Sequence, residues 1–414
     1  MKVNFLIFIS LTNFMFMSNE DIKNKIKQIT RSIFSEIVAI RRWIHQHPEL
    51  SFQEKETSQY ICSVLEKNHI KYEHKVAGYG VVALIECQNP DTQVIGVRGD
   101  MDALPIQEKN DISYKSVYDG VMHACGHDAH TAVLLGTAIV LNKLKNNLRG
   151  TIKCIFQPAE EKLPGGASLM IKEGVLEKPK VDKMFALHVY PEFQVGTVGF
   201  RPGQYMAACD ELSILITGKG GHAALPDEVI NPITIGAEII LNVKNIVAQL
   251  PASKKYILEF GDFRAYGASN VIPEEAKIEG TLRTLDEDFR YLVHGILLDE
   301  VQKIGIKHQA TCKMKIIKGY PSLYNNPELT KNCEILSREF LDQDSVKKLD
   351  IRMASEDFSY FSQELPCCFF RLGVANNHIN NLVHTPHFNI DEKSLEIGVG
   401  LMSYLVASNL LYQT

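Results

Sequence analysis

Residues 93–104 read QVIGVRGDMDAL, a short β-rich run that ends in charged residues. An apolar run of this length, bounded by polar residues, is typical of a buried β-strand. HTAVLLGTAIVLNKLKNN (130–147) then predicts a long apolar helix, and GTIKCIFQPAEE (150–161) predicts a second strand that ends in acids. Strands that alternate with helices indicate an α/β fold with a mixed, largely parallel sheet flanked by helices.

The ends of these strands carry the polar residues. A third run, KMFALHVY (183–190), predicts a strand that ends near His188. In open α/β sheets the ligand site lies beyond the carboxyl ends of the strands. Asp100 and Asp102, the pair Glu160 and Glu161, and His188 all fall at predicted strand ends. We therefore expect these five side chains to gather at one edge of the sheet.

The pattern along the rest of the chain indicates two domains. Residues 19–66 predict two amphipathic helices that are interrupted at Pro48. Over 209–320 the order of predicted elements becomes β-α-β-β-α-β, which is typical of a small α+β sandwich. The α/β pattern resumes afterwards. We expect one discontinuous domain made of 19–208 and 321–414, into which 209–320 is inserted.

Composition excludes some classes of partner. The 414 residues carry a net charge of −5 and no long basic run, which argues against nucleic acid. The nine cysteines are odd in number and irregularly spaced, and no CxxC pair occurs. A disulfide framework is therefore not expected, and a reducing compartment such as the cytoplasm is favoured.

The first residues allow two interpretations. Residues 1–18 contain one lysine and then an apolar run of signal-peptide length. This run is too short and too broken for a membrane span, so we expect no stable membrane association. The alternative is that translation begins at Met17 and that residues 1–16 are an extension. A signal would direct the protein to secretion or an organelle instead of the cytoplasm.

The stretch VMHACGHDAH (121–130) contains three histidines, a cysteine and an aspartate. Cys125 and His127 could both ligate a metal, with Gly126 allowing the backbone to bend between them. A structural zinc site needs four soft ligands in paired short spacings, which are missing here. A catalytic site takes a mixture of His, carboxylate and Cys. The alternative is a nucleophilic Cys125 with His127 or His130 as its base.

Glu160 and Glu161 follow an apolar strand and precede a turn. Paired glutamates usually mark a solvated face, but successive side chains at a strand end point to different sides. One carboxylate can then bind a metal while its neighbour faces the water that the metal activates. Three histidines elsewhere, each weak evidence alone, are candidates for the same site: His188, His222 and His384.

Seven motifs occur in order: GVRGDMDALPIQE, MHACGHDAHTAVLLG, FQPAEE with GGASLMIKEGVLE, ALHVYP with GTVGFRPG, GKGGHAALPDEVINPI, NVIPEEAKIEGTLRT and HTPHFNID. Together they resemble the zinc-dependent aminoacylase and glutamate-carboxypeptidase superfamily, and the resemblance covers about residues 38–410. The similarity is strongest to its amidohydrolase branch, which holds hippurate hydrolases, N-acyl-amino-acid amidohydrolases and indole-acetyl-amino-acid hydrolases.

This resemblance implies a role for each candidate residue. It implies two divalent metal ions, zinc or manganese, with cobalt also acceptable. It implies that Glu160 is the general base, that Asp102 orients a ligand histidine, and that His222 polarises the scissile carbonyl, often from the partner subunit. Asn270 and Arg283 lie in a segment used near the substrate carboxylate. The five implied metal ligands are Cys125, His127, Glu161, His188 and His384.

The implied reaction is hydrolysis of the amide bond of a small N-acyl amino acid by a metal-bound hydroxide. The implied assembly is a homodimer paired through the inserted domain, which would act as a lid or dimerisation domain. Asp100 stands where distant superfamily members have a ligand His, and we do not expect it to bind metal. Two alternatives are a dipeptidase or carboxypeptidase of the same superfamily and a non-catalytic binding protein on this fold.

Overall fold

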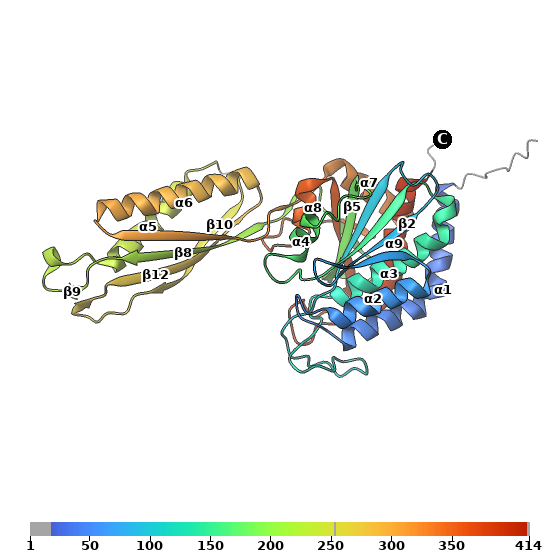
Figure 1. Ribbon diagram of the computed structural model, residues 1–414, viewed down its shortest axis with the longest axis horizontal. Helices are drawn as coiled ribbons and strands as arrows, with labels where there is room; N and C mark the ends of the chain where they lie inside the picture. Colours follow the sequence, from blue (N-terminus) through green and yellow to red (C-terminus); the bar gives the residue numbers. More distant parts are fainter. Residues whose placement is uncertain (1–17, 252–253, 412–414) are drawn as a thin grey trace, which may run out of the picture.

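The computed structural model describes residues 18–251 and 254–411, whose strands form two main sheets in separate bodies (Figure 1). The predicted leader falls on residues that lie outside this description, apart from Ser18. Ser18 is the N-cap of the first helix, where its side chain accepts a hydrogen bond from the Asp21 backbone. The side chain of Asp21 in turn accepts from the backbone of Ser18, which completes a capping box.

The larger sheet has eight strands in the order β1-β2-β4-β3-β5-β16-β6-β15. Its four central strands, β4, β3, β5 and β16, are parallel, whereas β1/β2, β2/β4 and β16/β6 pair in the antiparallel sense. The predicted mixed and largely parallel sheet is confirmed. Its strands are β1 (Lys71–Val76), β2 (Gly80–Glu86), β3 (Val94–Asp100), β4 (Thr151–Gln157), β5 (Lys183–Gln194), β6 (Val198–Phe200), β15 (Val346–Lys348) and β16 (Cys367–Ala375).

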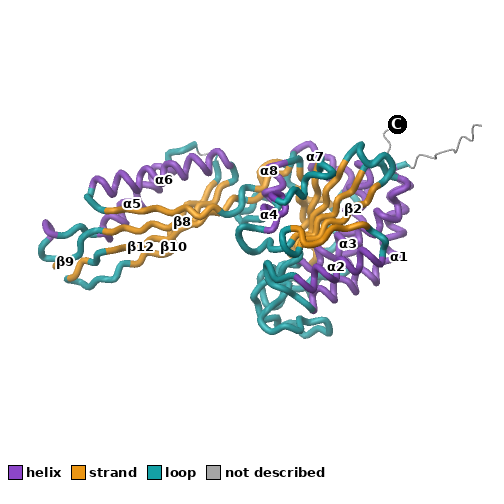
Figure 2. The backbone as a smooth tube through the Cα atoms, in the orientation of Figure 1, coloured by secondary structure: helices purple, strands orange, loops and turns teal. Residues whose placement is uncertain are grey.

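Helices cover both faces of this sheet (Figure 2). One face packs against α1 (Asn19–Gln46), α2 (Lys55–Lys67), α3 (His127–Leu144), α7 (Pro327–Phe340) and α9 (Lys393–Leu410) in a single apolar core. The other face packs against the short helices α4 (Gly166–Lys172) and α8 (Ser359–Glu364). α3 is buried almost all round because it lies between the sheet and the pair α1 and α9. Its uniformly apolar sequence suits that central position.

The smaller sheet belongs to the inserted region, and its order is β10-β12-β8-β13. The predicted β-α-β-β-α-β order is confirmed by β8 (Ala208–Thr217), α5 (Pro232–Ala248), β10 (Tyr256–Arg264), β12 (Glu275–Thr284), α6 (Glu287–Lys307) and β13 (Thr311–Lys318). α5 and α6 bury their apolar sides on this sheet in a core of its own. The remaining elements are β7 (Gly203–Met206), β9 (Gly221–His222), β11 (Val271–Ile272), β14 (Leu323–Asn325) and the 3-10 turns Lys145–Asn147 and Pro226–Glu228.

Two local expectations differ from the structure. His188 does not end its strand, because β5 continues to Gln194 and stays paired with β16 on the far side of His188. α3 begins at His127 instead of His130, so the predicted helix gains a turn that carries the motif residues. All nine cysteines are free. Within the described part of the chain, no helix has the length and apolar character that a membrane crossing needs.

Candidate active site

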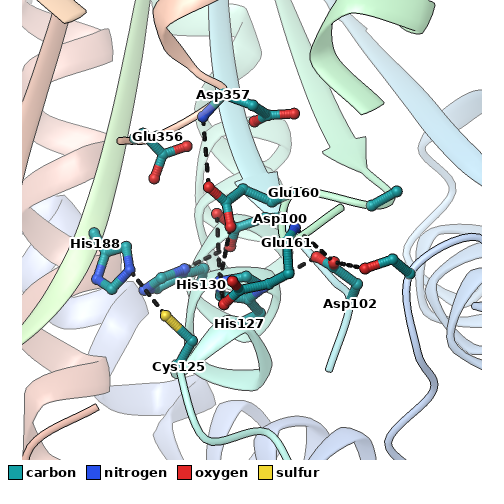
Figure 3. A network of polar contacts seen from close by, with 12 residues as sticks. Asp100, Asp102, Cys125, His127, His130, Glu160, Glu161, His188, Glu356 and Asp357 are labelled. Carbon is teal, nitrogen blue, oxygen red and sulfur yellow. Dashed lines mark hydrogen bonds and ion pairs between the residues drawn. The ribbon is translucent and has the colours of Figure 1, made fainter. Parts of the chain in front are cut away.

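The candidate ligands come from four parts of the larger domain that are far apart in the chain. Cys125 lies in the loop before α3, and His127 is the first residue of that helix. Glu160 and Glu161 follow β4, and His188 lies within β5. His384 comes from the loop between β16 and α9. The parallel pairing of β3 with β4 and β5 places Glu160, Glu161 and His188 beside Cys125 and His127 at one edge of the sheet (Figure 3). His384 joins them from its loop through its contact with Cys125.

Gly126 is required between Cys125 and His127. Its φ of 86° lies in the left-handed region, and a Cβ added here would lie 2.5 Å from Cγ2 of Val189. Only glycine fits a left-handed residue so close to a neighbouring strand. The backbone reversal at Gly126 therefore turns both Cys125 and His127 toward β5.

Cys125 is the centre of the cluster. Its Sγ lies 3.4 Å from Nε2 of His188 and 3.3 Å from Nε2 of His384. Nε2 of His384 also lies 3.2 Å from Oε1 of Glu161. Among the compact groups of possible donor atoms, two share the cysteine: Cys125 with His127 and His188, and Cys125 with Glu161 and His384. Two overlapping sets with one common member fit a pair of adjacent cations.

An unsatisfied atom supports this fit. Nε2 of His127 is buried and makes no hydrogen bond. A buried polar atom without a partner is costly, so such an atom on a residue that can ligate metal indicates a missing partner. The set of one thiol, three imidazoles and one carboxylate is suited to divalent transition metals. The structure thus fits two divalent metal ions held by the five residues that the sequence implied.

Asp102 fixes the orientation of His127. Oδ1 of Asp102 lies 3.1 Å from Nδ1 of His127, so Nε2 is the atom turned toward the cluster. Burial alone would lower the pKa of His127, but the charge of Asp100 and the bond to Asp102 raise it well above its ordinary value. A histidine held in this way presents a defined nitrogen to a metal.

Glu160 lies beside the cluster and is almost fully buried. Its Oε2 is 4.0 Å from Nε2 of His127, and its Oε1 accepts a weak hydrogen bond from the Asp357 backbone at 3.4 Å. Burial, with the nearby carboxylates of Glu356 and Glu161, raises the pKa of Glu160 well above its ordinary value. A carboxyl group that readily holds a proton next to a metal site can act as a general base and acid.

Buried polar residues lie behind the cluster, and three of them, Arg98, Glu356 and Asp357, were not predicted. Arg98 pairs with Asp100 at 2.5 Å, with Asp357 at 2.8 Å and with Glu356 at 3.1 Å. Asp100 also binds Nδ1 of His130 at 2.5 Å. Glu356 and Asp357 lie before α8 without a local pattern that would reveal them, whereas the polar end of the 93–104 strand did mark Asp100.

The structure explains why two motif residues lie behind the cluster. Nε2 of His130 accepts the backbone N–H of Val189 at 2.9 Å, so both of its ring nitrogens have protein partners. Asp100 uses its oxygens on Arg98 and His130. With these contacts, His130 and Asp100 stabilise this edge of the sheet.

His222 and Asn270 do not reach the cluster within this chain. His222 lies in β9 and Asn270 next to β11, a short pair at the end of the inserted domain farthest from the larger sheet (Figure 1). Arg283 lies near the other end of β12, where its Nη1 donates to the Met353 carbonyl at 2.8 Å. The structure therefore separates Asn270 from Arg283, although the sequence placed them in one substrate-binding segment.

A parallel α/β sheet that carries a Cys, His and carboxylate cluster at one edge, with an inserted α+β domain, defines the class of di-metal hydrolases. Residues 96–408 match the sequence model of peptidase family M20/M25/M40, and the chain belongs to this family. The predicted superfamily is thereby confirmed.

Relatives cover nearly the whole chain. An N-acyl-L-amino acid amidohydrolase of Geobacillus stearothermophilus is 39% identical over 308 residues, which are 74% of this chain and 82% of that protein. Thermostable carboxypeptidase 1 of Saccharolobus solfataricus is 37% identical over 385 residues, 91% of this chain and 96% of that protein. The Bacillus subtilis YXEP protein, a dinuclear metal binding peptidase of the M20 family, has a TM-score of 0.78 at 31% identity, covering 92% of this chain and 99% of that one. These relatives confirm the predicted class of enzyme, a hydrolase of amide bonds.

Proposed function

We propose that this enzyme hydrolyses the amide bond of N-acyl amino acids of the N-acetyl, N-benzoyl or indole-acetyl type. The observation that carries the proposal is the position of Glu160, a buried carboxyl group 4.0 Å from the unpaired Nε2 of His127. The motif order, and the amidohydrolase relative at 39% identity, support this substrate class over other amides.

Each residue of the proposed site would have a separate role. Cys125, His127, Glu161, His188 and His384 would hold the two ions, and Asp102 would keep His127 in the required tautomer. When bound, such ions lower the pKa of a water molecule and polarise the acyl carbonyl. Glu160 would take a proton from the attacking water at a carboxylate oxygen and then give it to the nitrogen of the departing amine. The raised pKa of Glu160 suits a group that must carry a proton between these two steps.

The chemistry of the donors favours particular metals. A cysteine thiolate suits zinc, while imidazole and carboxylate donors also accept manganese or cobalt. We therefore propose zinc or manganese as the native metal. Metal analysis of the purified protein, followed by reconstitution of the chelated enzyme with each ion, distinguishes them.

A carboxypeptidase or dipeptidase is the second candidate, because a carboxypeptidase relative covers 91% of this chain. Both candidates would use the same metal ligands and the same base. A panel of N-acetyl, N-benzoyl and indole-acetyl amino acids beside dipeptides separates them. Higher kcat/KM on dipeptides would favour the second candidate.

The test of the assigned base is Glu160→Gln, which keeps the shape of the side chain and removes its ability to accept a proton. We expect kcat on an N-acyl amino acid to fall about 10²–10⁴-fold while the metal content stays unchanged. Glu161→Gln is the matched comparison, because it should lose activity together with metal. Near-normal hydrolysis by Glu160→Gln, or full activity of the chelated wild type, would contradict the proposal.

A further inference from the structure

One buried arginine near the cluster has no acidic partner. Within the described part of the chain, the buried arginines are Arg41, Arg98, Arg290 and Arg371. The first three form ion pairs, with Asp128 at 2.7 Å, with Asp100 at 2.5 Å and with Asp210. No carboxylate of the described residues lies within 4.0 Å of Arg371, although its side chain is only 4% exposed.

The contacts of Arg371 are neutral. Its Nε donates to the hydroxyl of Tyr205 at 2.8 Å, and its Nη2 contacts Sδ of Met206 at 3.2 Å. Its Nη1 makes no hydrogen bond with the described residues. The rings of Phe369, Tyr205 and Tyr190 lie 5.1, 5.7 and 5.9 Å from the guanidinium. Aromatic faces attract a cation without forming an ion pair. Burial opposes the charge of Arg371, but Tyr205, Glu356 and Cys125 raise its pKa, so the charge is stabilised although no carboxylate pairs with it directly.

Arg371 is next to the proposed metal ligands. It lies directly across from His188 in the parallel pairing of β16 with β5. The Phe369 ring, which contacts Arg371, lies 6.4 Å from the His188 ring. Tyr190 and Tyr205, whose rings flank Arg371, also line a cavity of about 580 Å³ together with residues 348–354. Arg371 is thus a neighbour of a proposed metal ligand on the next strand and of two residues that line a cavity large enough for part of a small substrate.

We propose that Arg371 binds a carboxylate of the substrate and so determines specificity. This inference rests on the proposed function, since an N-acyl amino acid carries a carboxylate close to its scissile amide. The planar guanidinium with unused N–H groups matches a carboxylate in geometry and charge. A bound carboxylate supplies the ion pair that Arg371 lacks. A substrate without a carboxylate leaves Arg371 without an ion pair and binds less tightly.

The first test compares a substrate pair on the metal-loaded enzyme: an N-acetyl amino acid and the same compound with its carboxylate converted to a primary amide. We expect the wild type to prefer the acid at least about 10-fold in kcat/KM. Arg371→Met should raise KM for the acid about 10–100-fold and leave the amide unchanged, which removes the preference. Equal losses on both compounds would overturn the proposal. Arg371→Lys, which keeps the charge, should retain part of the preference.

Arg42→Met is the matched control. Its guanidinium lies 4.7 Å from the Tyr114 ring, and it already has an acidic partner in Glu392 at 2.6 Å. Removing this cation should leave the preference for the acid intact. A loss of preference in Arg42→Met equal to that in Arg371→Met would show that general positive charge, and not Arg371, selects the substrate.

A binding measurement separates this inference from the proposed function. Calorimetry on the chelated full-length chain measures binding without turnover. The chain is titrated with the N-acetyl amino acid and, separately, with its amide. Tighter binding of the acid in the wild type, lost in Arg371→Met, supports the inference even if no N-acyl amino acid is hydrolysed. Equal binding of both compounds by the wild type overturns it. N-acetylglutamate α-amide, which keeps only a side-chain carboxylate, shows which carboxylate Arg371 receives.

Discussion

Asp102 lies 3.1 Å from His127 through Oδ1 and Nδ1, and its other oxygen accepts the backbone N–H of Glu161 at 3.0 Å. A single buried carboxylate thus holds two of the five proposed ligands, one through its ring and one through its backbone. Ser51 completes this arrangement by donating its hydroxyl to Oδ2 of Asp102 at 2.7 Å. The strand end after β3 is therefore connected to the residues that follow β4.

Loss of Asp102 should weaken metal binding more than it weakens the fold. In Asp102→Ala we expect metal affinity to fall about 10–100-fold, because His127 loses the acceptor that fixes its tautomer. Competition with a chromogenic chelator measures this change. Ser51→Ala, which removes only a bond to Oδ2, should change affinity little. Wild-type affinity in Asp102→Ala would show that His127 needs no orienting acid.

The sequence was sufficient to predict the sheet and the local part of the site. Apolar runs of strand length alternate with helical patterns, so the parallel strands and their polar ends follow from residues 93–104, 150–161 and 183–190. Cys125 and His127 are two positions apart, so their proximity needs no tertiary information. The strand pattern also placed His188 at this edge, but its role as a ligand, and the whole of the prediction for His384, came from motif resemblance.

The remaining site residues depend on long-range packing. Arg98 and Asp357 are 259 positions apart, so their contact follows only from the fold. Arg371 lies in the apolar run CCFFRLGVA, where a sequence pattern cannot tell a paired arginine from an unpaired one. The continuation of β5 beyond His188 likewise depends on pairing with β16, a strand that comes about 180 residues later.

Lys153 is a buried cation whose hydrogen-bond partners are neutral, and its removal should lower the free energy of unfolding. Its Nζ donates to the carbonyls of Val175, Glu177 and Pro179 at 2.9, 2.7 and 2.9 Å. Lys153→Met leaves three carbonyls without this donor, so we expect the free energy of unfolding at pH 7 to fall by about 2–3 kcal/mol. Denaturant titration of both proteins measures the difference. A change under about 0.5 kcal/mol would mean that water replaces the ammonium without cost.

The same lysine predicts a pH dependence. Burial lowers the pKa of Lys153 from 10.5 to about 8. Between these values the unfolded chain binds the proton and the folded chain does not, so the contribution of Lys153 to stability rises as pH rises. The gap in unfolding free energy between wild type and Lys153→Met should therefore widen from pH 7 to pH 9.5. A constant gap would contradict a lowered pKa.

Asp210, in β8 of the inserted sheet, connects this strand to helix α6 and to the residue that follows β13. Its carboxylate accepts hydrogen bonds from Arg290, His294 and the Gly319 backbone. Removing it in Asp210→Asn leaves Arg290 buried without its main counter-charge, so we expect a loss of about 3 kcal/mol at neutral pH. Asp262→Asn, which removes a partly exposed acid on the same sheet, should change stability by less than about 1 kcal/mol.

Low pH should abolish the contribution of Asp210 to the free energy of unfolding. Burial opposes ionisation of this carboxyl group, but the hydrogen bond from Arg290 lowers its pKa from 3.8 to about 2. The stabilisation is therefore complete above pH 3.8 and is lost as pH falls through 2. Wild type and Asp210→Asn should differ most in unfolding free energy at pH 5 and converge toward pH 2. Curves that stay parallel over this range would contradict the assignment.

The position of His222 allows a test of whether two copies of the chain form a shared active site. It is exposed in β9, and its Nδ1 accepts the Ala224 backbone N–H at 3.1 Å, which leaves Nε2 as the proton-bearing nitrogen that points away from its own loop. Such a nitrogen can donate to a developing oxyanion, but in this chain β9 lies at the end of the inserted domain farthest from the larger sheet (Figure 1). If His222 serves the site of a second copy, Glu160→Gln and His222→Ala damage different sites of a mixed dimer. Co-refolding the two inactive variants in equal amounts should then restore about a quarter of wild-type activity, since half the dimers are mixed and each has one intact site.

The control is Glu160→Gln mixed with Glu161→Gln, which damages the same cluster in both chains and should restore no activity. Mixed dimers that form by sedimentation analysis but stay inactive would show that His222 does not act across subunits.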